Sequence, residues 1–185
     1  PAGVFKYFEE ICQVPRPSKK EEKIIAYLKA FGAKHNLETK VDEAGNVLIK
    51  KPATPGKENL QTVVLQSHID MVCEKNNDIQ HDFLTDPIET EIDGEWLKAK
   101  GTTLGADNGI GVATELAILA DDSIGHGPLE CLFTVDEETG LTGAFELKEG
   151  FMSGDILLNL DSEDEGEIFI GCAGGIDSVA EDRKS

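Results

Sequence analysis

Apolar side chains recur with helical spacing in two segments at the start of the sequence. The first segment, residues 4–14, ends before the prolines at positions 15 and 17. The second segment opens with Ser18 and Glu21 in an S-x-x-E pattern, which is typical of a capping box. Both segments therefore predict amphipathic helices that cover a core. Their apolar faces consist of Val4, Phe5, Phe8, Ile11 and Cys12, and of Ile24, Ile25, Leu28 and Phe31.

Shorter apolar runs with the composition of β-strands follow these helices. Residues 37–51 and 88–99 predict two hairpins, which turn at residues 44–46 and at Asp93-Gly94. Further strands are predicted at residues 62–66, 129–135, 156–160 and 167–170, and helices at residues 110–120 and 143–147. Strands that alternate with helices indicate the α/β class. We therefore expect a mixed, largely parallel β-sheet flanked by helices.

The composition is that of a single domain that binds neither membranes nor nucleic acid. With 185 residues, 39% of them apolar, the chain is long enough to enclose a core. No apolar stretch approaches the roughly 18 residues of a membrane span, and the first residues do not resemble a signal peptide, so we expect a cytoplasmic protein. The formal net charge of -19 argues against nucleic acid or an anionic membrane as a partner, because both bind clustered Lys and Arg.

The four cysteines are far apart in the sequence and form no C-x-x-C pair. They occupy positions 12, 73, 131 and 172. Dense or paired spacing would indicate a disulfide framework or a thiolate zinc site. We expect reduced thiols that pack as small apolar groups.

Residue types that bind metal ions follow three of the predicted strands, and a further acid precedes the predicted helix at residues 110–120. In an open α/β sheet the carboxyl ends of parallel strands meet at one edge, where ligands bind. One imidazole and several carboxylates brought together there predict a metal site. The residues are His68, Asp70, Asp107, Glu137, Glu138 and Asp161.

Two short motifs within this set indicate which side chains bind metal directly and which orient a ligand or face water. In the triplet HID, His68 and Asp70 point to the same side of an extended segment, so Asp70 can accept the second imidazole N–H and orient the ring. Glu137 and Glu138 are neighbours and point in different directions. One of the two is therefore available to bind metal while the other faces a water molecule.

The motifs SHIDMV, KGTTLGADNGIG, TVDEETG and NLDSEDEGE resemble those of the co-catalytic zinc peptidases, a family that includes carboxypeptidase G2 and the aminoacylases. Within that family, NNDIQHDF, DPIETEIDGEWLKAKGTTLGADNGIG and GCAGGID are similar to the Xaa-His dipeptidases. The resemblance extends from the first helix to the last residues. It implies hydrolysis of unblocked dipeptides, particularly Xaa-His, and a homodimer for the full-length family member.

The resemblance also implies a role for each residue of the site. His68 and Asp161 would bind one zinc ion, Glu138 the other, and Asp107 would bridge the two. Glu137 would be the general base that passes a proton from water to the leaving amine, and Asp70 would clamp His68. The family further implies a cis peptide between Asp107 and Asn108. Imidazole and carboxylate ligands also suit Mn²⁺ and Co²⁺, so the metal is not determined by these ligands alone.

The family takes several further parts from sequence that follows this region: another zinc-binding histidine, contacts to the substrate carboxylate, and a lid and dimerisation domain. The resemblance therefore implies that residues 1–185 are the N-terminal part of a catalytic domain. His35, His81 and His126 are the other histidines here, and each lies in a setting typical of a solvated or loop histidine. We expect the isolated chain to be inactive, and a non-catalytic metal-binding fragment or interaction protein remains the alternative.

Overall fold

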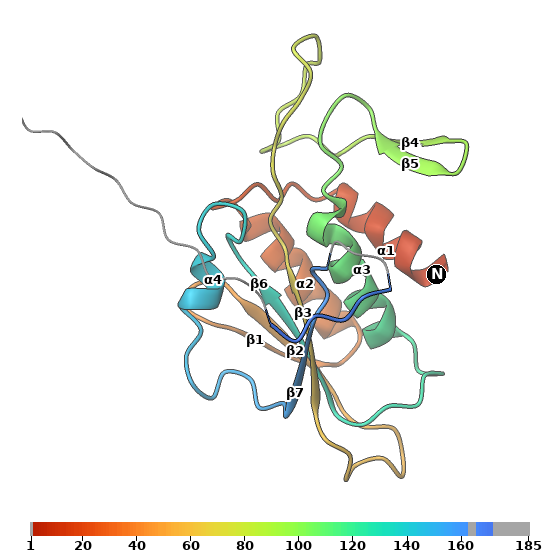
Figure 1. Cartoon of the computed structure of the whole chain (residues 1–185), viewed down its shortest axis with the longest axis vertical. Helices are drawn as coiled ribbons and strands as arrows, with labels where there is room; N and C mark the ends of the chain where they lie inside the picture. Colours follow the sequence, from red (N-terminus) through yellow and green to blue (C-terminus); the bar gives the residue numbers. More distant parts are fainter. Residues whose placement is uncertain (1, 163–165, 172–185) are drawn as a thin grey trace, which may run out of the picture.

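Five strands form the central sheet, in the order β1-β2-β6-β3-β7 (Figure 1). In the computed structural model, which describes residues 2–162 and 166–171, β1 pairs with β2 and β2 with β6 in antiparallel fashion. β3 runs parallel to both β6 and β7. The mixed sheet is confirmed, and β6, β3 and β7 make up its parallel part. The strands span Glu38–Val41, Val47–Lys51, Val63–His68, Leu129–Thr134 and Ile156–Asn159 for β1, β2, β3, β6 and β7.

Three helices cover one face of this sheet: α1 (Ala2–Cys12), α2 (Glu22–Lys34) and α3 (Ala106–Ala120). Their apolar stripes pack on strand residues that point to the same side, such as Ile49, Leu65 and Phe133. The alternate positions Leu48, Val64 and Leu132 face the other side. There they pack against the segment that follows the short helix α4 (Thr142–Phe145). The strands β2, β3 and β6 therefore contribute apolar side chains to both faces of the sheet.

A second hairpin lies apart from the central sheet, at the upper right of Figure 1. It consists of β4 (Thr90–Asp93) and β5 (Trp96–Ala99). Because Asp93 pairs with Trp96, the turn residues are Gly94 and Glu95, one position later than predicted. Gly94 has a φ of 63°, which favours glycine at this turn.

Two predictions about local structure are wrong. Glu21 forms no side-chain cap on α2; its Oε1 accepts hydrogen bonds from the N–H groups of Lys19 (2.9 Å) and Asp136 (3.0 Å) instead. Residues 167–170 form no strand, because no described strand lies beside them to complete the ladder, and Ile168 and Ile170 are fully exposed. The helix predicted at 110–120 begins earlier, at Ala106, and this extension carries Asp107.

The described cysteines agree with the prediction of reduced thiols. Cys12, Cys73 and Cys131 are free, and burial raises the pKa of Cys12 and of Cys73 to about 11. Cys172 lies outside the described residues. Among the helices of residues 2–162, none combines the length and apolar character needed to cross a bilayer.

Gly143 allows α4 to sit directly against the end of β6. A Cβ at this position would lie 2.5 Å from the carbonyl oxygen and 2.7 Å from the nitrogen of Val135. Because backbone atoms cannot move aside, we predict that Gly143→Ala lowers the free energy of unfolding by about 2 kcal/mol or more.

Urea unfolding monitored by circular dichroism measures this loss. Gly140→Ala is the matched control, because its added Cβ would meet nothing closer than Thr142 Oγ1 at 3.9 Å. Equal midpoints for the two variants would contradict the packing described for Gly143.

Candidate metal centre

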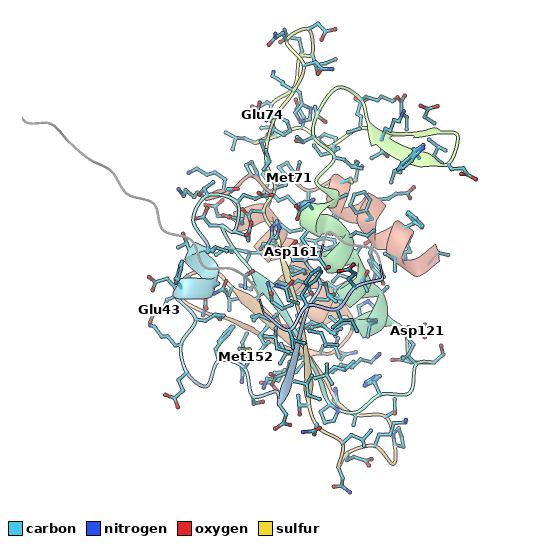
Figure 2. All side chains as sticks on the ribbon, viewed as in Figure 1. Glu43, Met71, Glu74, Asp121, Met152 and Asp161 are labelled. Atoms are coloured by element: carbon cyan, nitrogen blue, oxygen red, sulfur yellow. The ribbon has the colours of Figure 1, made fainter. Side chains whose placement is uncertain are left out.

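The carboxyl ends of the parallel strands bring the predicted ligands to one edge of the sheet. His68 ends β3, Glu138 follows β6 and Asp161 follows β7. Asp107 arrives from the first turn of α3, which lies over the same edge. In Figure 2, Asp161 lies near the upper end of the sheet, where Met71 follows β3. The topology therefore collects side chains that are far apart in the sequence.

His68 is the centre of this group and is 1% exposed. Its Nδ1 lies 3.2 Å from Asp70 Oδ1, and its Nε2 lies 3.0 Å from Asp107 Oδ1 and 3.9 Å from Asp161 Oδ2. Ligand atoms of His68, Asp107 and Glu138 all lie within 4.8 Å of one another. Burial alone would lower the pKa of His68, but the hydrogen bonds and charges of the surrounding acids raise that pKa to about 9.

Asp70 is fully buried and contacts both the imidazole of His68 and the backbone of Glu137 and Glu138. Besides facing His68, its carboxylate accepts hydrogen bonds from Ser18 Oγ (2.7 Å), Glu137 N (3.0 Å) and Glu138 N (3.2 Å). Burial would raise the pKa of Asp70, yet these donors and His68 lower it to about 2. Asp70 therefore stays ionised, orients the imidazole and fixes the backbone that carries the two glutamates.

The first turn of α3 departs from helical geometry at Asp107 and Asn108. The peptide bond between them is cis, as the resemblance implied. The Asn108 side-chain N–H group donates to Leu160 O (3.2 Å) and Asp161 Oδ1 (2.6 Å). This amide fixes one carboxylate oxygen of Asp161, so the other oxygen faces His68.

Arg16 ties the end of β3 to the start of α3. It is 3% exposed, and its guanidinium donates to Ile69 O (3.1 Å), Asp70 O (3.0 Å) and Gly105 O. A planar group with several donors suits three carbonyls from two segments. Arg16 was not predicted as a site residue, although its position between two prolines, just after an amphipathic helix, is unusual for an arginine.

Glu137 and Glu138 have different surroundings. Glu138 joins His68 and Asp107 in the ligand group, whereas Glu137 and Asp161 line a cavity of about 250 Å³ on the face of the sheet that carries α4. Burial raises the pKa of Glu137, and the charge of Asp161 adds to this rise against the opposing effect of His68. A carboxylate with a raised pKa beside an open space is suited to accept a proton.

A second group of acids, Glu21, Asp70 and Asp136, lies behind the site and is buried. Each of these carboxylates has protein partners: Glu21 accepts from Asp136 N, and Asp136 accepts from the hydroxyl groups of Thr139 and Thr142. These contacts support the loop that carries the two glutamates. Ser18, Glu21 and Asp136 were not identified as site residues from the sequence, because their contacts join segments that are far apart along the chain.

The other histidines lie away from the ligand group. His35 packs on the ring of Phe31, His81 packs on Phe83, and His126 Nδ1 lies 2.7 Å from Gly127 O. Within the described residues, neither candidate ligand group includes any of them.

Known proteins share the sequence of this region. The family model for Peptidase family M20/M25/M40 matches residues 64–179. The cytosol non-specific dipeptidase of Escherichia coli (strain K12) is 54% identical over 177 residues, which cover 96% of this chain and 36% of that protein. The chain thus spans about a third of the length of this curated relative.

Solved structures of peptidases are also similar to this chain. The aminoacylhistidine dipeptidase from Vibrio alginolyticus superposes with a TM-score of 0.88 at 57% identity, covering 90% of this chain and 34% of that one. Aminopeptidase PepT from Bacillus cereus ATCC 10987 gives a TM-score of 0.75 at 26% identity, covering 88% and 44%. The resemblance to this family and the fold that it implied are therefore confirmed.

We predict that Asp70→Asn weakens metal binding about 10- to 100-fold, the range typical for residues that orient a metal-binding histidine. The amide would present N–H groups to the donors of Ser18, Glu137 and Glu138, so the loop and the imidazole would both shift. Isothermal titration calorimetry of the purified chain with Zn²⁺ measures the affinity. Asp78→Asn, a change of the same chemistry at an exposed loop position, is the control. Unchanged affinity in Asp70→Asn would contradict the orienting role.

Proposed function

Because the chain belongs to peptidase family M20/M25/M40, whose members are metal-dependent peptidases, we propose that it forms part of a zinc-dependent dipeptidase. The proposed substrates are unblocked dipeptides, Xaa-His among them. Two relatives, a non-specific dipeptidase and an aminoacylhistidine dipeptidase, support this substrate class. The name of the first also supports a cytosolic location.

One observation carries the proposal: the carboxylates of Asp107, Glu138 and Asp161 gather around a histidine whose Nδ1 atom faces Asp70. A bound cation would offset the repulsion between these like charges. One imidazole nitrogen and several carboxylate oxygens form a donor set that zinc accepts, and Mn²⁺ and Co²⁺ accept it as well. The residues therefore fit the metal ions that the family requires.

We assign His68 and Asp161 to one ion, Glu138 to the other, and Asp107 to both. Asp107 Oδ1 lies 3.0 Å from His68 Nε2, and Asp107 also belongs with Glu138 to one group of neighbouring ligand atoms, which supports a carboxylate shared by both ions. Bound metal would polarise the scissile carbonyl and lower the pKa of water. Asn108 holds Asp161 in its ligand position through a hydrogen bond of 2.6 Å.

Glu137 is the proposed general base. Its backbone N–H is fixed by Asp70 at 3.0 Å, while its side chain lines the cavity and stays outside the ligand group. The raised pKa of Glu137, caused first by burial, matches a group that must take a proton from water and return it to the leaving amine. Asp70 remains ionised and holds the imidazole of His68 throughout this proton transfer.

In this assignment the ligand sets of the two ions are unequal within the described residues. His68, Asp107 and Asp161 would hold the first ion, whereas only Asp107 and Glu138 would hold the second. This inequality favours a second candidate function for the isolated polypeptide, a metal-binding fragment without turnover. We propose that a further histidine, the lid and the contacts of a homodimer belong to other parts of a longer protein.

The roles of the two glutamates are separable by mutation. In a full-length protein that contains this segment, we predict that Glu137→Gln lowers kcat about 10²- to 10⁴-fold and leaves two metal ions bound, because only the proton acceptor is lost. Glu138→Gln should instead reduce the occupancy of one ion. Metal analysis by mass spectrometry and an assay with Gly-His test both statements. The reverse pattern of metal loss would overturn the assignment.

For the 185-residue chain alone, we predict at most one tightly bound zinc ion and negligible hydrolysis of Gly-His. Three protein ligands and water complete the four-coordinate geometry that zinc favours, and the second ion lacks this number. Isothermal titration with zinc and a ninhydrin assay measure both quantities. Two tight sites with rapid turnover would show that these residues contain the whole catalytic apparatus.

A further inference from the structure

A buried carboxyl group links the helix that carries Asp107 to the strand that carries His68. Glu115 lies on α3, two turns after Asp107, and has no exposed surface. Its Oε1 accepts a hydrogen bond of 2.6 Å from the hydroxyl of Ser67, the residue before His68 on β3. The thiol of Cys131 on the neighbouring strand β6 lies beside the same carboxyl. The proposed mechanism assigns no role to Glu115.

This position is costly for a glutamate. Burial raises the pKa of Glu115 well above its ordinary value, although Ser67 and Cys131 oppose the rise. Its second oxygen, Oε2, has no hydrogen-bond partner among the described residues. An apolar side chain of similar volume would avoid both penalties, so stability alone does not account for a glutamate here. Buried polar groups of this kind are best attested where they fix the register between packed elements.

The contact between α3 and β3 is close at this point. Gly111, one turn before Glu115, faces Ser67, and an added Cβ would lie 3.0 Å from the Ser67 Cβ. The same Cβ would overlap the side-chain oxygen of Asn108. Helix and strand therefore meet with almost no space between them, and the bond from Ser67 to Glu115 is a fully buried polar contact that fixes their alignment, two turns from the contact of Asp107 with His68.

We propose that Glu115 is a positioning residue: its bond to Ser67 sets the register of α3 on β3 and thereby the separation of Asp107 from His68. This inference rests on the proposed function, since it assumes that both residues bind metal. An α-helix rises 1.5 Å per residue, so a slip by one residue would move Asp107 by about 1.5 Å. Metal-site geometry tolerates about 0.5 Å. A small change in register would therefore disturb the bridging position.

Cobalt substitution tests the proposal, because the visible absorption of Co²⁺ reports its coordination geometry independently of catalysis. The chain would be titrated with Co²⁺ as wild type, Glu115→Gln and Glu115→Leu. We expect Glu115→Gln to retain the wild-type spectrum and an affinity within about twofold, since the amide oxygen still accepts from Ser67. Glu115→Leu should alter the spectrum and weaken binding about tenfold, the lower end of the range for residues that orient ligands.

The matched control is Leu119→Val, one turn further along α3, where the side chain is 2% exposed and belongs to the core. This variant should lose stability with no change in spectrum or cobalt affinity. Equal effects of Leu119→Val and Glu115→Leu, or a wild-type spectrum in Glu115→Leu, would overturn the positioning role. If Glu115→Leu does not fold, Ser67→Ala removes the same hydrogen bond and is judged by the same two outcomes. A wild-type chain that binds no cobalt would instead overturn the proposed function on which this role rests.

Discussion

The buried carboxylate of Asp70 is the interaction on which the site depends. Its partners come from three separate segments: the loop between α1 and α2, the end of β3, and the loop after β6. A carboxylate without partners in such a position would be protonated or would destabilise the fold by several kcal/mol. Here its hydrogen bonds replace water so fully that the pKa falls to about 2 in spite of burial. The same bonds that stabilise the charge thus align the residues around His68.

Arg16 supplies a buried positive charge close to this carboxylate. Its charge lies among backbone carbonyls of residues 69, 70 and 105, and no side-chain acid forms an ion pair with it in the described residues. The positive charge is nevertheless close enough to affect the buried acids, since Asp70 and Asp107 both oppose the lowering of the Arg16 pKa by burial. One cation therefore offsets part of the negative charge of the site while it holds the loop before α3 in place.

The sequence predicts the parts of the fold that local patterns control. Apolar runs predicted the strands, and metal-binding residue types at strand ends and before a helix pointed to His68, Asp107, Glu138 and Asp161, which the structure brings together. The predictions from sequence were wrong where a side chain bonds to a segment that is distant along the chain. Ser18 and Glu21 have the spacing of a helix cap, but tertiary contacts with Asp70 and Asp136 take their oxygen atoms. Residues 167–170 have the composition of a strand, but a strand also needs a neighbour, which local composition does not specify.

The last strand of the sheet has a consequence for how molecules of this chain behave toward one another. Within the described residues β7 ends the sheet, so its outer backbone groups pair with no strand, and Ile156, Leu157 and Leu158 are each at least 40% exposed. Such an edge is a template for a strand from another molecule. The net charge of -19 opposes that encounter through repulsion between molecules, and salt screens this repulsion. The excess of acidic residues therefore limits association through this edge in dilute buffer, and concentrated salt weakens that protection.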